Sequence, residues 1–200
     1  MSLSPERDGR LTASDFAAAM GLNPSKPRPR LYREKIGTEP LFNGNHMTQY
    51  GNDNEMNAIE AYELDQRVFV DNCGENQIFI KHPQHDWLGC TPDGRVMTEN
   101  RLVEVKCPWG KMHTEAKPQY VAQTMGQMAI TGATECDLTV WSPEELRIWR
   151  IQFSQEYWDM QLPLLEYFWQ CVLDKTIPKP FHKDRNPKPV MPPVDIELLF

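Results

Sequence analysis

The stretch that decides the fold is TPDGRVMTENRLVEVKCPW, residues 91–109. Two short runs, RVM and RLVEVKC, stand on either side of the compact turn TEN at residues 98–100. This arrangement is typical of an antiparallel β-hairpin. The first strand of the hairpin follows Pro92-Asp93 and the second contains Glu104-Val105-Lys106. The hairpin therefore brings two groups of charged residues toward each other.

The position of the turn sets the predicted register of this hairpin. With its centre between residues 99 and 100, Arg95 lies opposite Glu104. Asp93 then lies opposite Lys106. Side chains alternate along a strand, so Glu104 and Lys106 share one face while the neighbouring valines share the other. Because Asp93 stands at the open end of the hairpin, we expect two carboxylates and one ammonium to meet there.

Such a group of side chains has a specific chemistry. Converging carboxylates and a backbone carbonyl are hard oxygen ligands, which favour Mg²⁺ or Mn²⁺ over zinc. A bound cation of this kind polarises a phosphoryl oxygen and acidifies a water. A neighbouring lysine can orient the attacking water or neutralise charge on the phosphate. The pattern predicts phosphodiester hydrolysis; the alternative is a surface hairpin with an ion pair that contributes less than about 1 kcal/mol.

A third carboxylate precedes the hairpin. Residues 54–64 are expected to form a helix, because Ala58, Ile59 and Tyr62 recur at helical spacing. Glu55 lies three, four and seven residues before them and therefore shares their packed face. The alternative is an acid that complements the dipole at the helix N-terminus. Further helices are expected at residues 11–22, 118–132 and 154–174.

The remaining elements are short strands and extended segments. Strands are expected between residues 66 and 106, and again at 136–141 and 146–153. The stretch KPRPRLYREK at residues 26–35 predicts a loop, because three nearby prolines disfavour a helix. We expect one domain over residues 1–175. The proline-rich residues 176–200 predict an extended segment whose apolar end, VDIELLF, docks on the domain or on a neighbouring subunit.

Composition limits the class of protein. A chain of 200 residues with 40% hydrophobic residues is long enough for one large domain. It has neither an apolar run long enough to span a membrane nor a secretory signal at its start, and its five cysteines lack zinc-ribbon spacing, so a cytoplasmic location is expected. The net charge of −7 argues weakly against a general nucleic-acid binder, but local basic residues and cation-binding acids can still attract phosphate.

The ordered motifs carry a resemblance to a known family. Pro92-Asp93 followed by Glu104-Val105-Lys106 resembles the PD-(D/E)XK nuclease signature. The chain is similar to the lambda-type phage exonucleases, the viral alkaline exonucleases of phage recombination. Five blocks match in order: Arg7 with Thr12-Ala13-Ser14, Gly51 with Glu55, Thr91 to Gly94, Leu102 to Pro108, and Tyr120 with Gln123. One Glu-x-Lys is a weak signal, whereas five ordered blocks are specific.

The resemblance implies a fold and an activity. The fold is of the α/β class, a restriction-endonuclease-like core in which a central mixed β-sheet is flanked by helices. The activity is Mg²⁺-dependent 5′-to-3′ exonuclease digestion of one strand of linear double-stranded DNA to mononucleotides, which leaves 3′ single-stranded tails. The family also implies a homotrimer ring that accepts double-stranded DNA ends, a single-strand annealing protein as partner, and phage or prophage origin in a bacterial cytoplasm.

The resemblance also assigns residues. Those implied in catalysis or metal binding are Glu55, Asp93, Glu104, the Val105 carbonyl, Lys106 and Gln123. Lys106 assists the attacking water, and Tyr120 lies on the DNA-binding side of the same helix as Gln123. Arg7 and Ser14 are expected to receive a terminal 5′-phosphate, although Arg7 can also be read as a solvated charge. The basic stretch supplies further candidates for duplex contacts, with a solvated loop as the alternative: Arg28, Arg30, Arg33 and Lys35.

Two other functions are compatible with this sequence. The first is a structure- or site-specific DNA endonuclease of the same superfamily, which would cut a closed circle that an exonuclease leaves intact. The second is a catalytically inactive DNA-binding recombination module. Inactive relatives usually lose a ligand or the lysine, whereas Glu55, Asp93, Glu104 and Lys106 are all present here.

Overall fold

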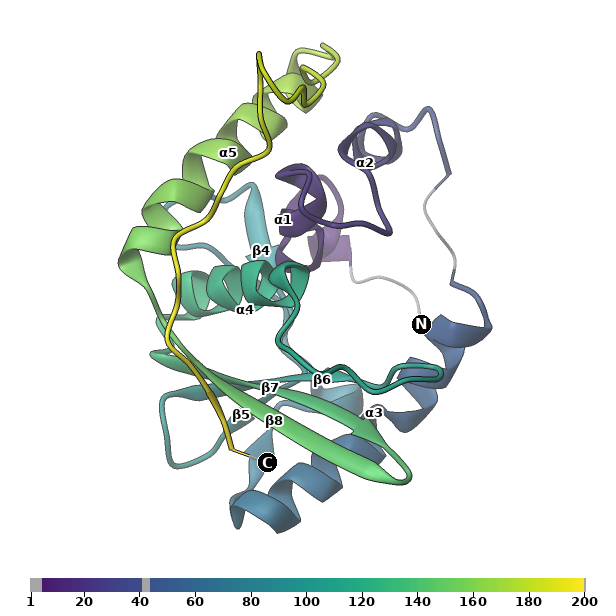
Figure 1. The fold of residues 1–200 in the computed structure, drawn as a ribbon, viewed down its shortest axis with the longest axis vertical. Helices are drawn as coiled ribbons and strands as arrows, with labels where there is room; N and C mark the ends of the chain where they lie inside the picture. Colours follow the sequence, from purple (N-terminus) through teal and green to yellow (C-terminus); the bar gives the residue numbers. More distant parts are fainter. Residues whose placement is uncertain (1–4, 41–43, 200) are drawn as a thin grey trace.

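The computed structural model describes residues 5–40 and 44–199. The described strands form a three-stranded sheet in the order β1-β4-β3 and a six-stranded sheet in the order β2-β5-β6-β7-β8-β9 (Figure 1). The strands are β1 (Leu11–Thr12), β2 (Val70–Asp71), β3 (Ile80–Lys81), β4 (Leu88–Cys90), β5 (Gly94–Val96), β6 (Arg101–Lys106), β7 (Glu135–Ser142), β8 (Glu145–Gln152) and β9 (Ile196–Leu198). The helices are η1 (Pro5–Arg7), α1 (Ala13–Ala19), α2 (Arg28–Lys35), α3 (His46–Gln66), η2 (Gly74–Asn76), α4 (Pro118–Thr131) and α5 (Gln155–Leu173).

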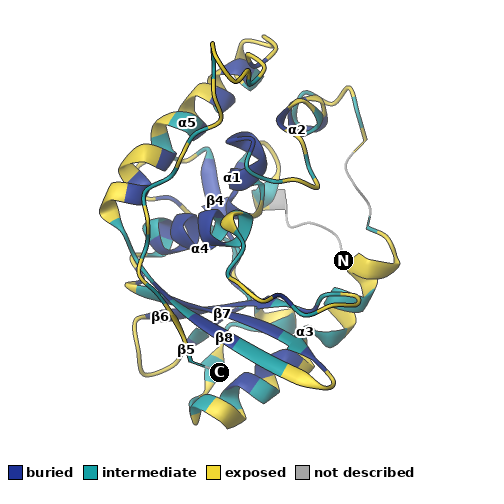
Figure 2. Ribbon diagram, viewed as in Figure 1, coloured by how far each residue is buried: buried dark blue, intermediate teal, exposed yellow. Residues whose placement is uncertain are grey.

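The six-stranded sheet is mixed, as predicted. Strands β6 and β7 are parallel, and α4 makes the crossover between them. The other pairs in this sheet are antiparallel. Strand β6 is buried on both faces because helices cover both, and it lies between β5 and β7 in the middle of the sheet (Figure 2). The expected central mixed sheet flanked by helices is confirmed.

Alternation along β6 sends its side chains to two different cores. Val103 and Val105 pack with Ala58, Ile59 and Tyr62 of α3. Leu102 packs on the other face with Val121, Met125 and Met128, which form the apolar stripe of α4. Glu104 and Lys106 share that second face, where α4 also supplies polar residues. The predicted division of β6 between an apolar face and a charged face is therefore confirmed.

The predicted register of the β5–β6 hairpin is wrong by two residues. The observed pairs are Gly94 with Val103 and Arg95 with Leu102, which extend to Asp93 opposite Glu104. The turn contains one more residue at its start than expected, because Val96 ends β5 and the loop spans residues 97–100. A shift of two keeps every side chain on its predicted face. Asp93 therefore still lies beside β6, as predicted.

The basic stretch is a helix and not the predicted loop. Helix α2 spans Arg28–Lys35, and Pro27 is its N-cap residue. Pro29 lies in the first turn, where a missing backbone N–H costs no intrahelical hydrogen bond and where the fixed φ of proline suits the helix. The prolines therefore start this helix instead of preventing it.

Helix α3 begins earlier than expected, at His46 instead of residue 54. The side chain of Asn45 caps it by accepting a 3.0 Å hydrogen bond from the backbone N–H of Thr48. The first two turns are polar and largely exposed, so they carry no apolar periodicity that would reveal a helix. Helix α5 runs unbroken past Pro163.

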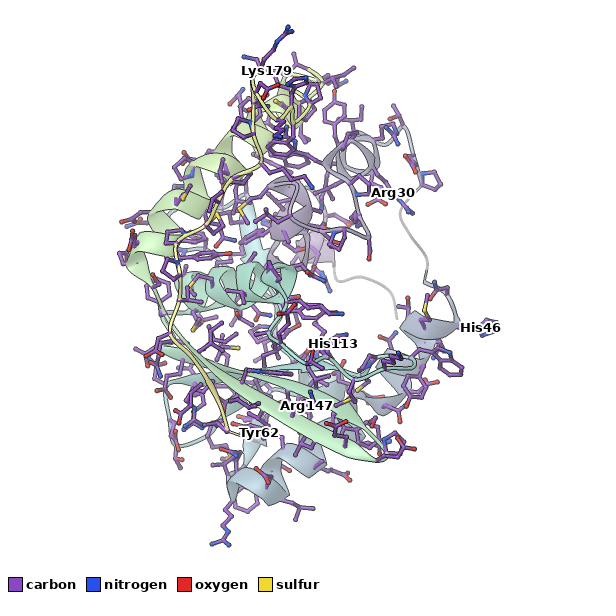
Figure 3. All side chains as sticks on the ribbon, in the orientation of Figure 1. Arg30, His46, Tyr62, His113, Arg147 and Lys179 are labelled. Carbon is purple, nitrogen blue, oxygen red and sulfur yellow. The ribbon has the colours of Figure 1, made fainter. Side chains whose placement is uncertain are left out.

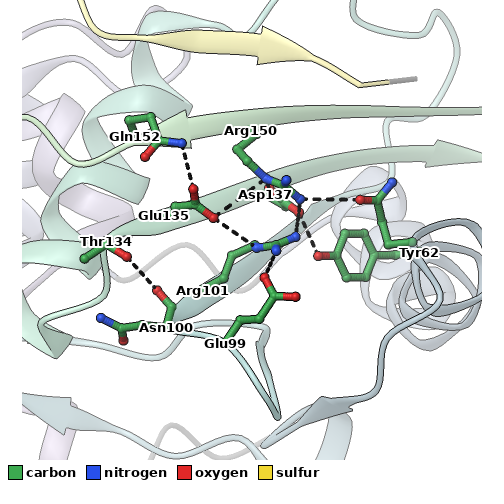
Figure 4. Close-up of polar contacts among 10 residues, drawn as sticks. Tyr62, Glu99, Asn100, Arg101, Thr134, Glu135, Asp137, Arg150 and Gln152 are labelled. Carbon is green, nitrogen blue, oxygen red and sulfur yellow. Dashed lines mark hydrogen bonds and ion pairs between the residues drawn. The ribbon is translucent and has the colours of Figure 1, made fainter.

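A charged network is buried beneath the sheet, between α3 and strands β6 to β8 (Figure 4). Asp137 of β7 is fully buried. Its carboxylate accepts hydrogen bonds from Tyr62 (2.7 Å), from Arg101 (3.1 Å) and from Arg150 (2.8 and 2.9 Å). These bonds satisfy the buried charge and attach α3 to the sheet.

The C-terminal segment returns along the molecule to the far edge of the sheet (Figure 1). There β9 pairs antiparallel with β8 of the same chain, through Trp149 with Leu198 and Ile151 with Ile196. The apolar end of the segment thus docks on its own domain; its last residue, Phe200, lies outside the described residues. Within the described chain, no helix is long and apolar enough to cross a membrane.

Candidate active site

The residues predicted for catalysis and metal binding meet in one cavity of about 330 Å³. Helix α3 supplies Glu55, the turn before β5 supplies Asp93, and β6 supplies Glu104 and Lys106. The structure thus brings together the carboxylates and the lysine that the sequence singled out. The cavity is also lined by Arg7, Thr12, Ser14, Gln77, Val105, Gln123 and Gln127.

Glu104 is fully buried and held from two sides. Gln123 of α4 donates a 2.6 Å hydrogen bond to Oε1, and Gln127 donates a 2.6 Å hydrogen bond to Oε2. Because these glutamines are four residues apart, they project from one face of the helix. The ammonium of Lys106 contacts Oε1 from the neighbouring position of the strand. The carboxylate is therefore held in one orientation by two amides and one ammonium.

Asp93 and Glu55 are linked by an amide that the sequence did not reveal. Gln77 donates from Nε2 to Glu55 Oε1 at 2.7 Å and to Asp93 Oδ1 at 3.4 Å. Burial, with the nearby charge of Glu104, raises the pKa of Glu55 and raises that of Asp93 well above its usual range. Burial and the repulsion between neighbouring carboxylates therefore both disfavour the charged forms of Glu55 and Asp93.

Lys106 is the counter-charge of this site. Burial alone would lower its pKa, but the charges of Glu104 and Asp93 outweigh burial and raise it, so the side chain stays an ammonium. Its Nζ also lies 5.3 Å from the ring centroid of Tyr120, which comes from the first turn of α4. A permanent positive charge here suits a residue that faces a phosphate or an attacking water.

The donor atoms fit a hard divalent cation. Carboxylate oxygens of Glu55, Asp93 and Glu104 and the carbonyl of Val105 are the ligands that Mg²⁺ and Mn²⁺ prefer. The raised pKa values of Glu55 and Asp93 add a physical reason, since a cation would relieve the excess negative charge. Across residues 5–40 and 44–199, however, no three acidic, histidine or cysteine side chains are arranged to hold an ion as they stand. In this arrangement Gln77 contacts Glu55 and Asp93, and Lys106 contacts Glu104.

Arg7 of η1 and Ser14 of α1 also line the cavity. Ser14 lies in the first turn of α1, where its hydroxyl is 3.2 Å from that of Thr12. A guanidinium and hydroxyls at one wall can hydrogen-bond a phosphate. The structure places both residues in reach of a ligand in the cavity, as the motif predicts, and their expected role stays a prediction.

The three arginines of α2 have partners within the chain. Arg28 is buried and its guanidinium lies 3.8 Å from the ring centroid of Phe181, in the C-terminal segment. Arg30 pairs with Glu34 at 3.2 Å, and Arg33 with Glu39 at 2.7 Å. Arg28 therefore has a structural role that the sequence did not suggest. The predicted duplex contacts of these arginines, and of Lys35, stay untested predictions.

Two residues that line the cavity, Gln77 and Gln127, were not predicted as site residues, for different reasons. Gln127 has a visible signal, because it lies one helical turn from Gln123 on a polar stripe. Gln77 has none, since it follows the short helix η2 in a stretch without periodicity and reaches the site only through the tertiary fold. A contact between residues 77, 55 and 93 cannot be read from local patterns.

Comparison with known proteins gives the family. The family described as YqaJ-like viral recombinase domain matches residues 4–134, which include every site residue named above on η1, α1, α3, β6 and α4. The chain belongs to the YqaJ-like viral recombinase family. No curated protein matches it in sequence. The resemblance to lambda-type phage exonucleases is confirmed by this match together with solved structures.

The solved structures share the fold of this YqaJ-like protein. The alkaline exonuclease LHK-Exo from Laribacter hongkongensis is 25% identical, with a TM-score of 0.70 over 84% of this chain and 90% of that one. LHK-Exo in complex with dAMP gives 27% identity and a TM-score of 0.66, over 84% and 88%. A phage related exonuclease from Haemophilus somnus 129PT, 15% identical with a TM-score of 0.65 over 84% and 96%, agrees in fold alone. The family and these likenesses support a nuclease role for the YqaJ-like chain.

Proposed function

We propose that this protein is a divalent-metal-dependent 5′-to-3′ exonuclease that degrades one strand of linear double-stranded DNA to mononucleotides. One observation carries the proposal: Glu55, Asp93, Glu104 and Lys106 line the same cavity as Arg7 and Ser14. A hydrolytic centre and a phosphate-binding wall within one cavity suit an enzyme that works at a chain end. The match to the YqaJ-like family and the likeness to the alkaline exonuclease LHK-Exo support the same conclusion.

The chemistry divides among the residues of the cavity. Mg²⁺, or Mn²⁺ in its place, would be held by Glu55, Asp93, Glu104 and the Val105 carbonyl, and would polarise the scissile phosphate and acidify a water. Lys106 donates to the attacking water or to the phosphate oxygen on which charge develops. Gln123 and Gln127 hold Glu104 in place, so that its carboxylate does not rotate during the reaction.

The direction of digestion follows from the phosphate wall. Arg7 and Ser14 are proposed to bind the phosphate at the 5′ end of the strand, which sets the next phosphodiester bond against Lys106 and the carboxylates. Tyr120 beside Lys106 contacts the same strand. Contacts to phosphates alone give no base specificity, and an exonuclease requires none.

The proposed product is a duplex with 3′ single-stranded tails, the substrate of recombination by strand annealing. A single-strand annealing protein is therefore the proposed partner, in the cytoplasm of a bacterial host of the phage or prophage. We also propose a homotrimer ring around the duplex. In a ring an acidic outer surface is compatible with DNA binding, because three copies of a few inward-facing bases line one channel.

Linear duplex DNA labelled separately at each 5′ and 3′ end, beside a closed circle, tests the proposal. With Mg²⁺, we expect loss of 5′ label as mononucleotides, surviving 3′-ended strands and an intact circle, and no reaction in chelator. Nicking or linearisation of the circle would show the alternative endonuclease. Binding without hydrolysis under any divalent metal would show an inactive DNA-binding module. The Lys106→Ala variant is the control, since it should keep DNA binding and lose turnover.

A further inference from the structure

A large aromatic side chain stands exposed at the rim of the candidate active site. The Trp109 side chain has 64% of its surface exposed, although indole is among the side chains that gain most from burial. It lies two residues after Cys107, which lines the cavity. A single exposed apolar residue needs no explanation by itself, so its surroundings decide what it does.

Trp109 is held by an aromatic partner next to the cavity. Its ring meets the ring of Tyr50 edge to face, with centroids 5.1 Å apart and planes at 87°. Tyr50 lies near the start of α3, and the following residue, Gly51, lines the cavity. An edge-to-face pair leaves a face of the indole open to solvent. The contact therefore orients the indole at the entrance and keeps a flat apolar surface free.

The segment that carries Trp109 is positively charged. This segment, residues 107–117 between β6 and α4, contains two lysines, Lys111 and Lys117, and one acid, Glu115, so that it carries one net positive charge with a neutral histidine. Within residues 5–40 and 44–199, no carboxylate forms an ion pair with either lysine. Burial, followed by the charges of Lys117 and Lys106, lowers the pKa of His113 to about 4. Figure 3 shows His113 on this segment close to Arg147, whose guanidinium donates a 3.0 Å hydrogen bond to the His113 carbonyl. The entrance thus combines an open aromatic face with positive charge.

We propose that Trp109 is a stacking platform for a nucleobase of the DNA strand that enters the cavity. This inference rests on the proposed function, since it needs a strand whose phosphate faces Lys106 and the carboxylates. A nucleotide with its phosphate in the cavity must leave the base stack of the duplex, and its base then needs a new partner. Every base has a flat π-face, so stacking accepts all four bases, as digestion without sequence preference requires.

Binding measurements separate base stacking from charge. Each protein binds a duplex with a 5′-phosphate and a frayed 5′ end, measured by fluorescence anisotropy in chelator, where metal-dependent cleavage is absent. A second duplex has the same phosphates but abasic sugars at the three terminal nucleotides. We expect Trp109→Ala to weaken binding of the first duplex roughly five- to a hundredfold, the range for loss of one stacked base. Its affinity for the abasic duplex should equal that of the wild type.

Two variants complete the test. Trp109→Phe should retain most of the affinity, because it keeps an aromatic face. Phe69→Ala is the matched control, since Phe69 is 75% exposed but lies beyond the other end of α3, a helix of 21 residues and therefore about 30 Å long. It should bind both duplexes like the wild type.

Three outcomes would overturn the stacking role. The first is that Trp109→Ala binds both duplexes like the wild type, and the second is that it loses the same affinity for both. The third is a changed sedimentation coefficient with unchanged DNA affinity, which would show that the indole is a subunit contact. A wild-type protein that binds neither duplex would overturn this proposal and the proposed function together. If Trp109 is needed for base-dependent binding but no DNA is hydrolysed in Mg²⁺ or Mn²⁺, the exonuclease proposal is wrong and the stacking proposal is retained.

Discussion

The carboxylate of Asp93 accepts a 2.8 Å hydrogen bond from the backbone N–H of Val105. This bond ties the turn before β5 to β6 through Oδ2, while Oδ1 faces the Gln77 amide. Burial and the charge of Glu104 raise the pKa of Asp93. The ionised side chain therefore destabilises the fold as the pH rises above about 4, the ordinary pKa of an aspartate. The charge is therefore kept at a cost in stability, which is typical of a functional carboxylate.

The Asp93→Asn variant separates the two roles of this side chain. Asparagine keeps the oxygen that accepts from Val105 but removes the charge, so the free energy of unfolding at pH 7 should stay the same or rise. Hydrolysis of linear duplex DNA should fall at least a hundredfold, because the site loses an anionic metal ligand that is worth several kcal/mol. Urea unfolding and initial rates measure the two effects. Wild-type turnover by Asp93→Asn would remove Asp93 from the metal site.

Arg7 offers a test of polarity. If its guanidinium binds the 5′-phosphate, Arg7→Ala should reduce the ratio of rates on 5′-phosphorylated and 5′-hydroxyl ends by about tenfold, which corresponds to one charged hydrogen bond of about 1.5 kcal/mol. Arg33→Ala is the control, since Arg33 of α2 pairs with Glu39, which follows that helix, and does not line the cavity. An unchanged ratio in Arg7→Ala would place phosphate recognition elsewhere.

Much of the site could be predicted because its parts repeat at regular spacing. Alternation along β6 fixed the faces of Glu104 and Lys106, and the four-residue step on α4 aligned Gln123 with Gln127. The start of α3 and the whole of α2 could not, since polar residues and prolines conceal both from apolar periodicity. Gln77 joins the site through contacts distant in sequence, which no local pattern encodes.

Buried charge around Asp137 predicts a large effect on stability. Asp137→Ala leaves two guanidinium groups and the Tyr62 hydroxyl without their buried acceptor, and should cost about 3–5 kcal/mol. Tyr62→Phe removes one bond to a charged acceptor and should cost about 1.5–3 kcal/mol. Urea unfolding measures both, with Glu145→Ala as a surface control that should cost less than about 1 kcal/mol. A cost below that of the control would show that Asp137 is not the centre of the network.

The C-terminal segment should depend on Arg28. The guanidinium stacks on Phe181 and donates to the Lys179 carbonyl, although burial lowers its pKa. Arg28→Ala should lower the free energy of unfolding by about 2 kcal/mol, the value for a desolvated cation–π pair. It should also speed amide exchange at Asn186 of the C-terminal segment, whose N–H donates a 3.0 Å hydrogen bond to the His182 carbonyl. Arg28→Lys keeps the charge without the planar stack and should rescue only part of this loss. Unchanged exchange in Arg28→Ala would mean that other contacts hold the segment, such as β9 and the hydrogen bond from the Lys179 N–H to the Tyr167 hydroxyl.

The acid stability of the protein should report on His113. Its imidazole is buried beside Tyr120, with ring centroids 5.5 Å apart, and its pKa is lowered to about 4 by burial, Lys117 and Lys106. The unfolded chain takes up this proton near pH 6.5, before the folded state does. The contribution of His113 is therefore complete above about pH 6.5 and is lost as the pH falls toward 4.

His113→Phe removes this titration while keeping a ring against Tyr120. Between pH 7 and pH 4.5 the wild type should lose on the order of 2 kcal/mol more unfolding free energy than the variant, as measured by urea unfolding at each pH. Comparison with the wild type cancels the carboxylates that titrate over the same range. His46→Asn leaves the buried imidazole intact and should follow the wild type. Parallel curves for wild type and His113→Phe would mean that the imidazole takes up its proton at the same pH in the folded and the unfolded chain, and that burial does not lower its pKa.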